Sequence, residues 1–171
     1  MTIEQTDTRN ALVKALAGQA LSAARLICKI YWKIRRPLTL GVVAIILDQE
    51  HKVLLVEHSY QTGWRMPGGG VRKGESVCAA LQRELKEELG IICKPKAGDY
   101  LGTFYNPVDG KHDHVTLFLI NQWSHDQSCP ISFEIKRWGF FDVTQMPEYV
   151  TEGTRQRLAE FFDGAEASTW W

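Results

Sequence analysis

Hydrophobic side chains near the N-terminus recur at steps of three and four residues, the spacing of one face of an α-helix. The recurring positions are Leu12, Leu16, Ala20, Ala23, Ile27, Ile30 and Ile34. Polar and basic side chains occupy another face, and Pro37 follows directly after two arginines. Because proline disfavours helical backbone at the residue before it, the pattern predicts an amphipathic helix over about residues 11–34, within an N-terminal extension of residues 1–36.

The pattern changes to strands after this extension. Residues 38–47 form a β-branched apolar run, and a polar turn separates them from residues 52–58 (KVLLVEH), which are expected to be the returning strand of a hairpin. Residues 60–70 contain proline and several glycines and are expected to be a loop. Further strands are predicted over residues 115–123 and 136–143, and helices over residues 75–89 and 151–162.

This order of elements predicts a mixed α/β (α+β) fold, with a sheet between helices. The expected domain covers residues 37–163, and residues 164–171 are expected to form a short C-terminal tail. A chain of 171 residues, 44% of them hydrophobic, is long enough to bury a core without disulfides. None of the four cysteines lies in a CxxC pair or at a zinc-like spacing, so a reduced, cytoplasmic location is expected.

The net charge of zero argues against a uniformly basic nucleic-acid binder, and no nucleic-acid partner is expected. The charge is nevertheless uneven, because residues 1–36 carry +5 and the remainder carries −5. Two interpretations of the basic helix stay open. It packs on the domain or on a second copy in a homodimer, or residues 11–36 make a peripheral contact with anionic lipid. Packing on protein is the commoner role of such helices and is favoured.

The helix over residues 75–89 carries a cluster of carboxylates. Glu84, Glu87 and Glu88 have spacings that place them on one sector of the helix, beside a leucine stripe. Like charges this close are destabilising unless a cation neutralises them, and Mg²⁺ prefers carboxylate oxygens and substrate phosphates as ligands. A solvated acidic face, with Arg83 paired to Glu87, is the alternative.

The whole span from Gly69 to Ile91 resembles the Nudix box, the signature of the Nudix hydrolase family. The segment reads GGVRKGESVCAALQRELKEELGI, with glycine, glutamate, arginine and hydrophobic residues at every defined position over 23 residues. The preceding Trp64-Arg65-Met66-Pro67-Gly68 resembles the usual lead-in to the box. The resemblance implies a Nudix-type α/β/α sandwich with a mixed sheet. It also implies a Mg²⁺-dependent enzyme, with Mn²⁺ as a substitute, that hydrolyses a nucleoside diphosphate linked to another moiety.

The resemblance also implies roles for particular residues. Glu84, Glu87 and Glu88 are expected to bind metal, with Glu75 as a secondary ligand. Glu84 is also a candidate for taking the proton of the attacking water, and Arg83 for orienting Glu84. Because the base of this family also occurs outside the box, Glu134 and Asp113 are further candidates; Glu134 is equally consistent with a metal ligand or a surface residue.

Substrate contacts are less clearly indicated. Gly69 and Gly70 are expected to shape the loop before the helix, and Arg65 to meet a phosphate. Trp64 is a candidate for stacking on a base, with packing in the core as its alternative. ADP-ribose or a nucleotide sugar is the favoured substrate class. The alternatives are a sanitising nucleoside triphosphate pyrophosphohydrolase and a nucleotide-sensing domain without catalysis.

Overall fold

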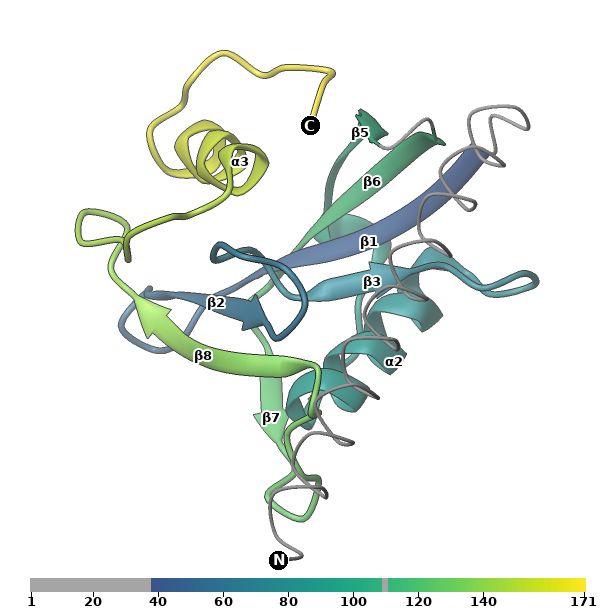
Figure 1. Ribbon diagram of the computed structural model, residues 1–171, viewed down its shortest axis with the longest axis vertical. Helices are drawn as coiled ribbons and strands as arrows, with labels where there is room; N and C mark the ends of the chain where they lie inside the picture. The colour runs from purple at the N-terminus through teal and green to yellow at the C-terminus, as the bar shows by residue number, and fades with distance from the viewer. Residues whose placement is uncertain (1–37, 109–110) are drawn as a thin grey trace, which may run out of the picture. The chain divides into compact units, whose positions relative to one another are not determined.

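The computed structural model describes residues 38–108 and 111–171 of the chain. The predicted N-terminal helix, with its lipid or dimer contacts, lies outside the described residues. The strands are β1 (Leu38–Ile46), β2 (Val53–His58), β3 (Gly68–Gly70), β4 (Ile91–Cys93), β5 (Tyr100–Val108), β6 (Lys111–Ile120), β7 (Trp123–His125) and β8 (Ile135–Phe141). The helices are α2 (Val77–Leu89), the short 3₁₀ turn η1 (Ala97–Asp99) and α3 (Glu152–Phe162) (Figure 1).

The central sheet has the strand order β3-β1-β6-β5, and two smaller antiparallel pairs, β2 with β8 and β4 with β7, lie beside it. One buried cluster joins one face of β1 to α2 through Val42, Ala44, Leu81, Leu85 and Leu89. A second cluster joins the other face of β1 to α3, and Ile45, Leu117 and Leu158 are among its members. The sheet therefore lies between two helices, as the sequence pattern predicts.

Strand β2 differs from the sequence expectation. Residues 38–47 and 52–58 do follow each other through a turn, but β1 and β2 are bridged only where Leu47 meets Val53. Along its length β2 pairs with β8, from Val53 opposite Phe141 to His58 opposite Ile135. The reason is that β1 already has β3 and β6 as its hydrogen-bonded neighbours, so β2 needs another partner.

The expected loop of residues 60–70 also ends in a strand. Gly68, Gly69 and Gly70 form β3 and pair antiparallel with Val43, Val42 and Gly41 of β1. Gly68 has a φ of 142°, and a Cβ there would lie 2.1 Å from the carbonyl oxygen of Val42. Only glycine therefore lets the chain approach β1 so closely and turn into α2.

Helix α2 is capped at both ends, by Ser76 at its start and by Gly90 at its end. The Ser76 hydroxyl accepts a hydrogen bond from the amide of Ala79 at 3.2 Å, which satisfies a free donor of the first turn. Gly90 has a left-handed φ of 65°, and its amide donates to the carbonyls of the last turn. Leu81, Leu85 and Leu89 are fully buried, so packing fixes the rotation of α2 and hence the direction of its carboxylates.

The C-terminal tail packs on the sheet. The amide of Tyr105 in β5 donates to the Thr169 carbonyl, and the amide of Trp171 donates to the Tyr105 carbonyl, each at 2.9 Å. Beneath this contact the buried Arg157 of α3 donates to the Trp170 carbonyl at 2.7 Å and to Glu160 at 2.6 Å. Residues 169–171 therefore extend the packed structure past α3.

Candidate active site

Glu84 packs directly against the backbone of β3. A Cβ on Gly69 would lie 2.5 Å from the Glu84 carboxyl carbon and 2.7 Å from both of its oxygens. By contrast, a Cβ on the neighbouring Gly70 would meet nothing within 4 Å. The two glycines thus have different roles: Gly69 leaves room for the Glu84 carboxylate, and Gly70 offers its carbonyl to Arg83 at 3.0 Å.

Arg83 connects the carboxylates of the cluster. Its guanidinium donates to both oxygens of Glu75, at 2.8 and 2.9 Å, and to Glu84 at 2.7 Å. Its contact with the half-exposed Glu87 is longer, at 3.3 Å, and Arg72 contacts the same Glu87 oxygen at 3.3 Å. Arg83 is therefore placed to orient Glu84.

The two best-held carboxylates differ in their electrostatics. The hydrogen bonds from Arg83, with the backbone amide of Arg72, lower the pKa of Glu75 to about 2. Burial raises the pKa of Glu84, and Arg83 offsets only part of that effect, while the charges of Glu88 and Glu87 add to it. Glu84 is therefore an incompletely compensated carboxylate, the kind of group whose perturbed pKa is typical of functional sites.

Glu88 lies deeper in the protein, with 7% of its surface exposed. One of its oxygens lies 3.1 Å from Nε2 of His58 at the end of β2, and the other accepts a hydrogen bond from the amide of Gly68 at 3.2 Å. His58 was not a site candidate from the sequence. A signal was nevertheless present, because strand alternation places it on the same face as Leu54 and Val56, toward α2.

The segment of residues 132–134 borders this site. The Ser132 amide donates to the Glu88 carbonyl at 3.0 Å, and the Ser59 amide donates to the Glu134 carbonyl at 2.7 Å. The pKa of the Tyr60 phenol, which is 55% exposed, is raised by burial and also by the charges of Glu134 and Glu88. The structure thus brings Glu134 to the rim of the carboxylate cluster, as a residue with an exposed side chain.

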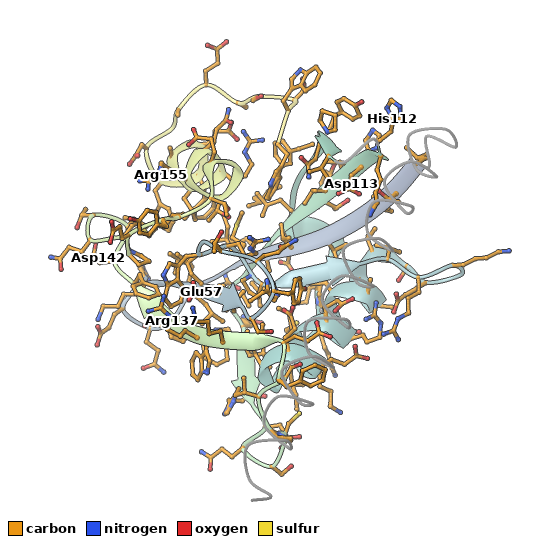
Figure 2. All side chains as sticks on the ribbon, in the orientation of Figure 1. Glu57, His112, Asp113, Arg137, Asp142 and Arg155 are labelled. Atoms are coloured by element: carbon orange, nitrogen blue, oxygen red, sulfur yellow. The ribbon has the colours of Figure 1, made fainter. Side chains whose placement is uncertain are left out.

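Asp113, the other candidate base, lies on the opposite side of the sheet. It accepts a hydrogen bond from the Thr39 hydroxyl at 2.6 Å (Figure 2). In β6 it shares the alternating face of Leu117, which packs toward α3, whereas Phe118 packs toward α2. Its position does not support the role of base for the α2 carboxylates.

Trp64 and Arg65 occupy different environments. Trp64 is 7% exposed and packs edge-on against Phe141, with the guanidinium of Arg137 5.1 Å above its ring. Arg137 in turn pairs with Glu57 at 2.6 Å across β2 and β8 (Figure 2). Trp64 is thus a core residue, the alternative that the sequence left open. Burial lowers the pKa of Arg65, whose guanidinium is held by Gln61 and by the Thr62 carbonyl.

The donor set fits a hard divalent cation. Glu75, Glu84, Glu87 and Glu88 supply four carboxylates, and the arginines that contact them number two, so negative charge is in excess. Within residues 38–108 and 111–171, no three acidic, histidine or cysteine side chains converge as a ready-made metal cage. Open carboxylate sites of this kind suit Mg²⁺, which keeps waters and substrate oxygens among its ligands.

Known proteins resemble this chain in both sequence and fold. The family model described as the NUDIX domain matches residues 37–162. The structure of a MutT Nudix hydrolase from Burkholderia pseudomallei superposes with a TM-score of 0.61 at 25% identity, covering 71% of this chain and 95% of that one. The family model covers more than half of the chain and the fold agrees with that of a solved member, so the chain belongs to the Nudix family.

Two curated relatives carry names of particular reactions. An ADP-ribose pyrophosphatase of Methanocaldococcus jannaschii is 30% identical over 108 residues, covering 60% of this chain and 62% of that protein. A CTP pyrophosphohydrolase of Escherichia coli is 37% identical over 78 residues, covering 43% of this chain and 56% of that protein. The chain thus spans less than two thirds of each. No helix among the described residues has the length and apolar character needed to cross a membrane.

Proposed function

We propose that this protein is a Mg²⁺-dependent pyrophosphohydrolase that cleaves a nucleoside diphosphate linked to another moiety, such as ADP-ribose or a nucleotide sugar. The observation that carries the proposal is the arrangement of Glu84 and Glu88, four residues apart on α2 and both held against β3. A solvated acidic face, the alternative from the sequence, would leave both carboxylates in water. Here Glu88 is buried, and burial raises the pKa of Glu84.

In this proposal Glu84, Glu87 and Glu88 hold Mg²⁺, or Mn²⁺ in its place. When bound, the ion would act as a Lewis acid and template for the phosphate oxygens. Glu75 is proposed as a secondary ligand, direct or through water. That both of its oxygens face Arg83 supports a place outside the inner set. Arg83 orients Glu84, and Gly69 leaves the space that the Glu84 carboxylate occupies.

The proton of the attacking water would pass to a carboxylate. Glu84 is one candidate, because its raised pKa makes it a better proton acceptor than an ordinary glutamate. Glu134 is the other, because its segment is hydrogen-bonded to both Glu88 and Ser59. Arg65, beside Tyr60, is proposed to meet a substrate phosphate, and Gly70 to form part of the loop that the substrate approaches.

The two relatives described above support a small nucleotide as substrate. The ADP-ribose pyrophosphatase supports the leading substrate class, and the CTP pyrophosphohydrolase supports the alternative of nucleoside triphosphates. The complete set of box carboxylates counts against a nucleotide-sensing domain without catalysis. We propose residues 37–163 as the catalytic domain and residues 1–36 as an extension whose role is packing, homodimer formation or lipid contact.

A panel of substrates tests this function. The full chain is assayed with Mg²⁺ against ADP-ribose, a UDP-sugar and CTP, and the products are identified by chromatography. Release of AMP and ribose 5-phosphate from ADP-ribose is the expected outcome. Faster release of pyrophosphate from CTP would favour the alternative reaction. Nucleotide binding without turnover of any compound would instead support a sensing domain.

A further inference from the structure

We propose that His58 is a positioning residue, which fixes the carboxylate of Glu88 for metal binding from outside the Nudix box. This inference rests on the proposed role of Glu88 as a metal ligand. The sequence gives His58 no motif, and its assignment comes from the contact between the end of β2 and the buried side of α2.

The imidazole of His58 faces helix α2. Leu54 and Val56 of β2 lie in the cluster that packs on α2, whereas Val53 and Leu55 lie in the opposite cluster. The register between β2 and β8 shifts between Glu57 and His58. The imidazole of His58 nevertheless contacts Glu88 of α2, so His58 lies on the face of Leu54 and Val56. Its side chain is 6% exposed, so it is placed by packing in the interior.

The Glu88 carboxylate is held by two strands at once. The imidazole Nε2 lies 3.1 Å from Oε1, and the Gly68 amide of β3 donates to Oε2 at 3.2 Å. A carboxylate oxygen accepts hydrogen bonds, so this contact is a hydrogen bond in the tautomer of His58 that carries its proton on Nε2. With a donor on each oxygen the plane of the carboxylate is fixed, and each oxygen keeps further lone pairs for a cation.

The surroundings of the imidazole ring also indicate that its role is the contact with Glu88. Tyr60 stacks on it, with ring centroids 5.1 Å apart and an interplanar angle of 26°. The other ring nitrogen, Nδ1, is buried and has no hydrogen-bond partner among the described residues. A buried polar atom without a partner is unfavourable, so an apolar residue would suit a purely structural role better. The nitrogen that does have a partner points at Glu88 alone.

The test uses Mn²⁺ as the probe and needs no substrate. Binding to the full chain is followed by the electron paramagnetic resonance signal of free Mn²⁺, and thermal unfolding of each variant is recorded without metal. His58→Ala is expected to weaken Mn²⁺ binding by about 10- to 100-fold, the usual effect of removing a residue that orients a metal ligand. His58→Gln places an amide N–H near the position of Nε2 and is expected to restore most of the affinity.

His58→Asn is the matched control, because its amide is too short to reach Glu88. It should bind Mn²⁺ as weakly as His58→Ala. A double variant completes the design: in a Glu88→Gln background, His58→Ala should cause no further loss of affinity, because the histidine acts only through Glu88. If His58 had only a structural role, His58→Ala would lower Mn²⁺ affinity together with the thermal midpoint. Its loss of affinity would then add to that of Glu88→Gln, and His58→Gln would not restore it.

The proposal is overturned if His58→Ala binds Mn²⁺ as tightly as the wild type, or if the losses from His58→Ala and Glu88→Gln add. Either result leaves the proposed hydrolase function standing, since the wild type would still bind metal. Absence of Mn²⁺ binding by the wild type would overturn both this inference and the proposed metal-dependent function.

Discussion

Substitution of Gly69 by alanine tests how closely the glycine strand β3 and the carboxylate of Glu84 are matched. The added Cβ would lie 2.5 Å from the Glu84 carboxyl carbon. Carbon atoms in contact normally lie about 3.5–4.0 Å apart, so the carboxyl group has to retreat by about 1 Å. A misplacement of about 1 Å in a catalytic constellation costs about 100-fold in rate, which is about 2.7 kcal/mol of transition-state stabilisation.

The fold should survive this change. Gly69 has no positive φ, so alanine can adopt its backbone conformation, and the group that must move is the end of a flexible side chain. Gly98→Ala is the matched control, since Gly98 lies in η1 away from the carboxylates, has no positive φ, and its added Cβ would enter open space. We expect Gly69→Ala to lose about 100-fold in kcat/KM, with a thermal midpoint near that of the wild type.

The assay is the initial rate of hydrolysis of the best substrate in the panel, at saturating Mg²⁺, with Tm measured in parallel. This explanation is refuted if Gly69→Ala keeps the rate of the wild type, or if Gly98→Ala loses as much as Gly69→Ala. A large fall in the Tm of Gly69→Ala would show that the contact with Glu84 is structural.

Three further predictions concern stability. Leu85→Ala, in the buried stripe of α2, should lower the free energy of unfolding by about 2–5 kcal/mol in urea denaturation, and the same change at exposed Lys86 should have little effect. The pKa of Glu84 is higher in the folded protein than in the unfolded chain, so the unfolded chain loses the carboxyl proton at a lower pH. The free energy of unfolding should therefore fall as the pH rises from the ordinary pKa of a glutamate to the raised pKa of Glu84. Glu84→Gln should flatten that part of a curve of Tm against pH, and an unchanged slope would contradict the assignment. Glu160→Ala leaves the buried guanidinium of Arg157 without its carboxylate and should cost about 3 kcal/mol by calorimetry, whereas a loss near zero would show that Glu160 does not compensate that charge.

The sequence predicts the box helix best because several local signals agree there. Ser76, the leucine stripe and Gly90 each indicate the same element, and all three have the expected place in the structure. The carboxylates follow, since their spacing on a helix determines which face they share. Local agreement of this kind requires no knowledge of the rest of the fold.

The sequence fails where long-range pairing decides the structure. Adjacency along the chain favoured a hairpin of β1 and β2, but the edges of β1 are taken by β3 and β6. Three consecutive glycines read as a loop, although they form β3. The contact between His58 and Glu88 could not be predicted for the same reason, because the two residues lie 30 positions apart and on different elements.

We propose above all that the carboxylates of α2 form the metal-dependent catalytic site. The most direct test of this claim is the rate of Mg²⁺-dependent hydrolysis by Glu88→Gln beside that of the wild type, with Glu152→Gln at the exposed start of α3 as the matched control. We expect Glu88→Gln to lose about 100-fold or more in kcat, while Glu152→Gln keeps the rate of the wild type. Hydrolysis by Glu88→Gln at the wild-type rate would contradict the claim.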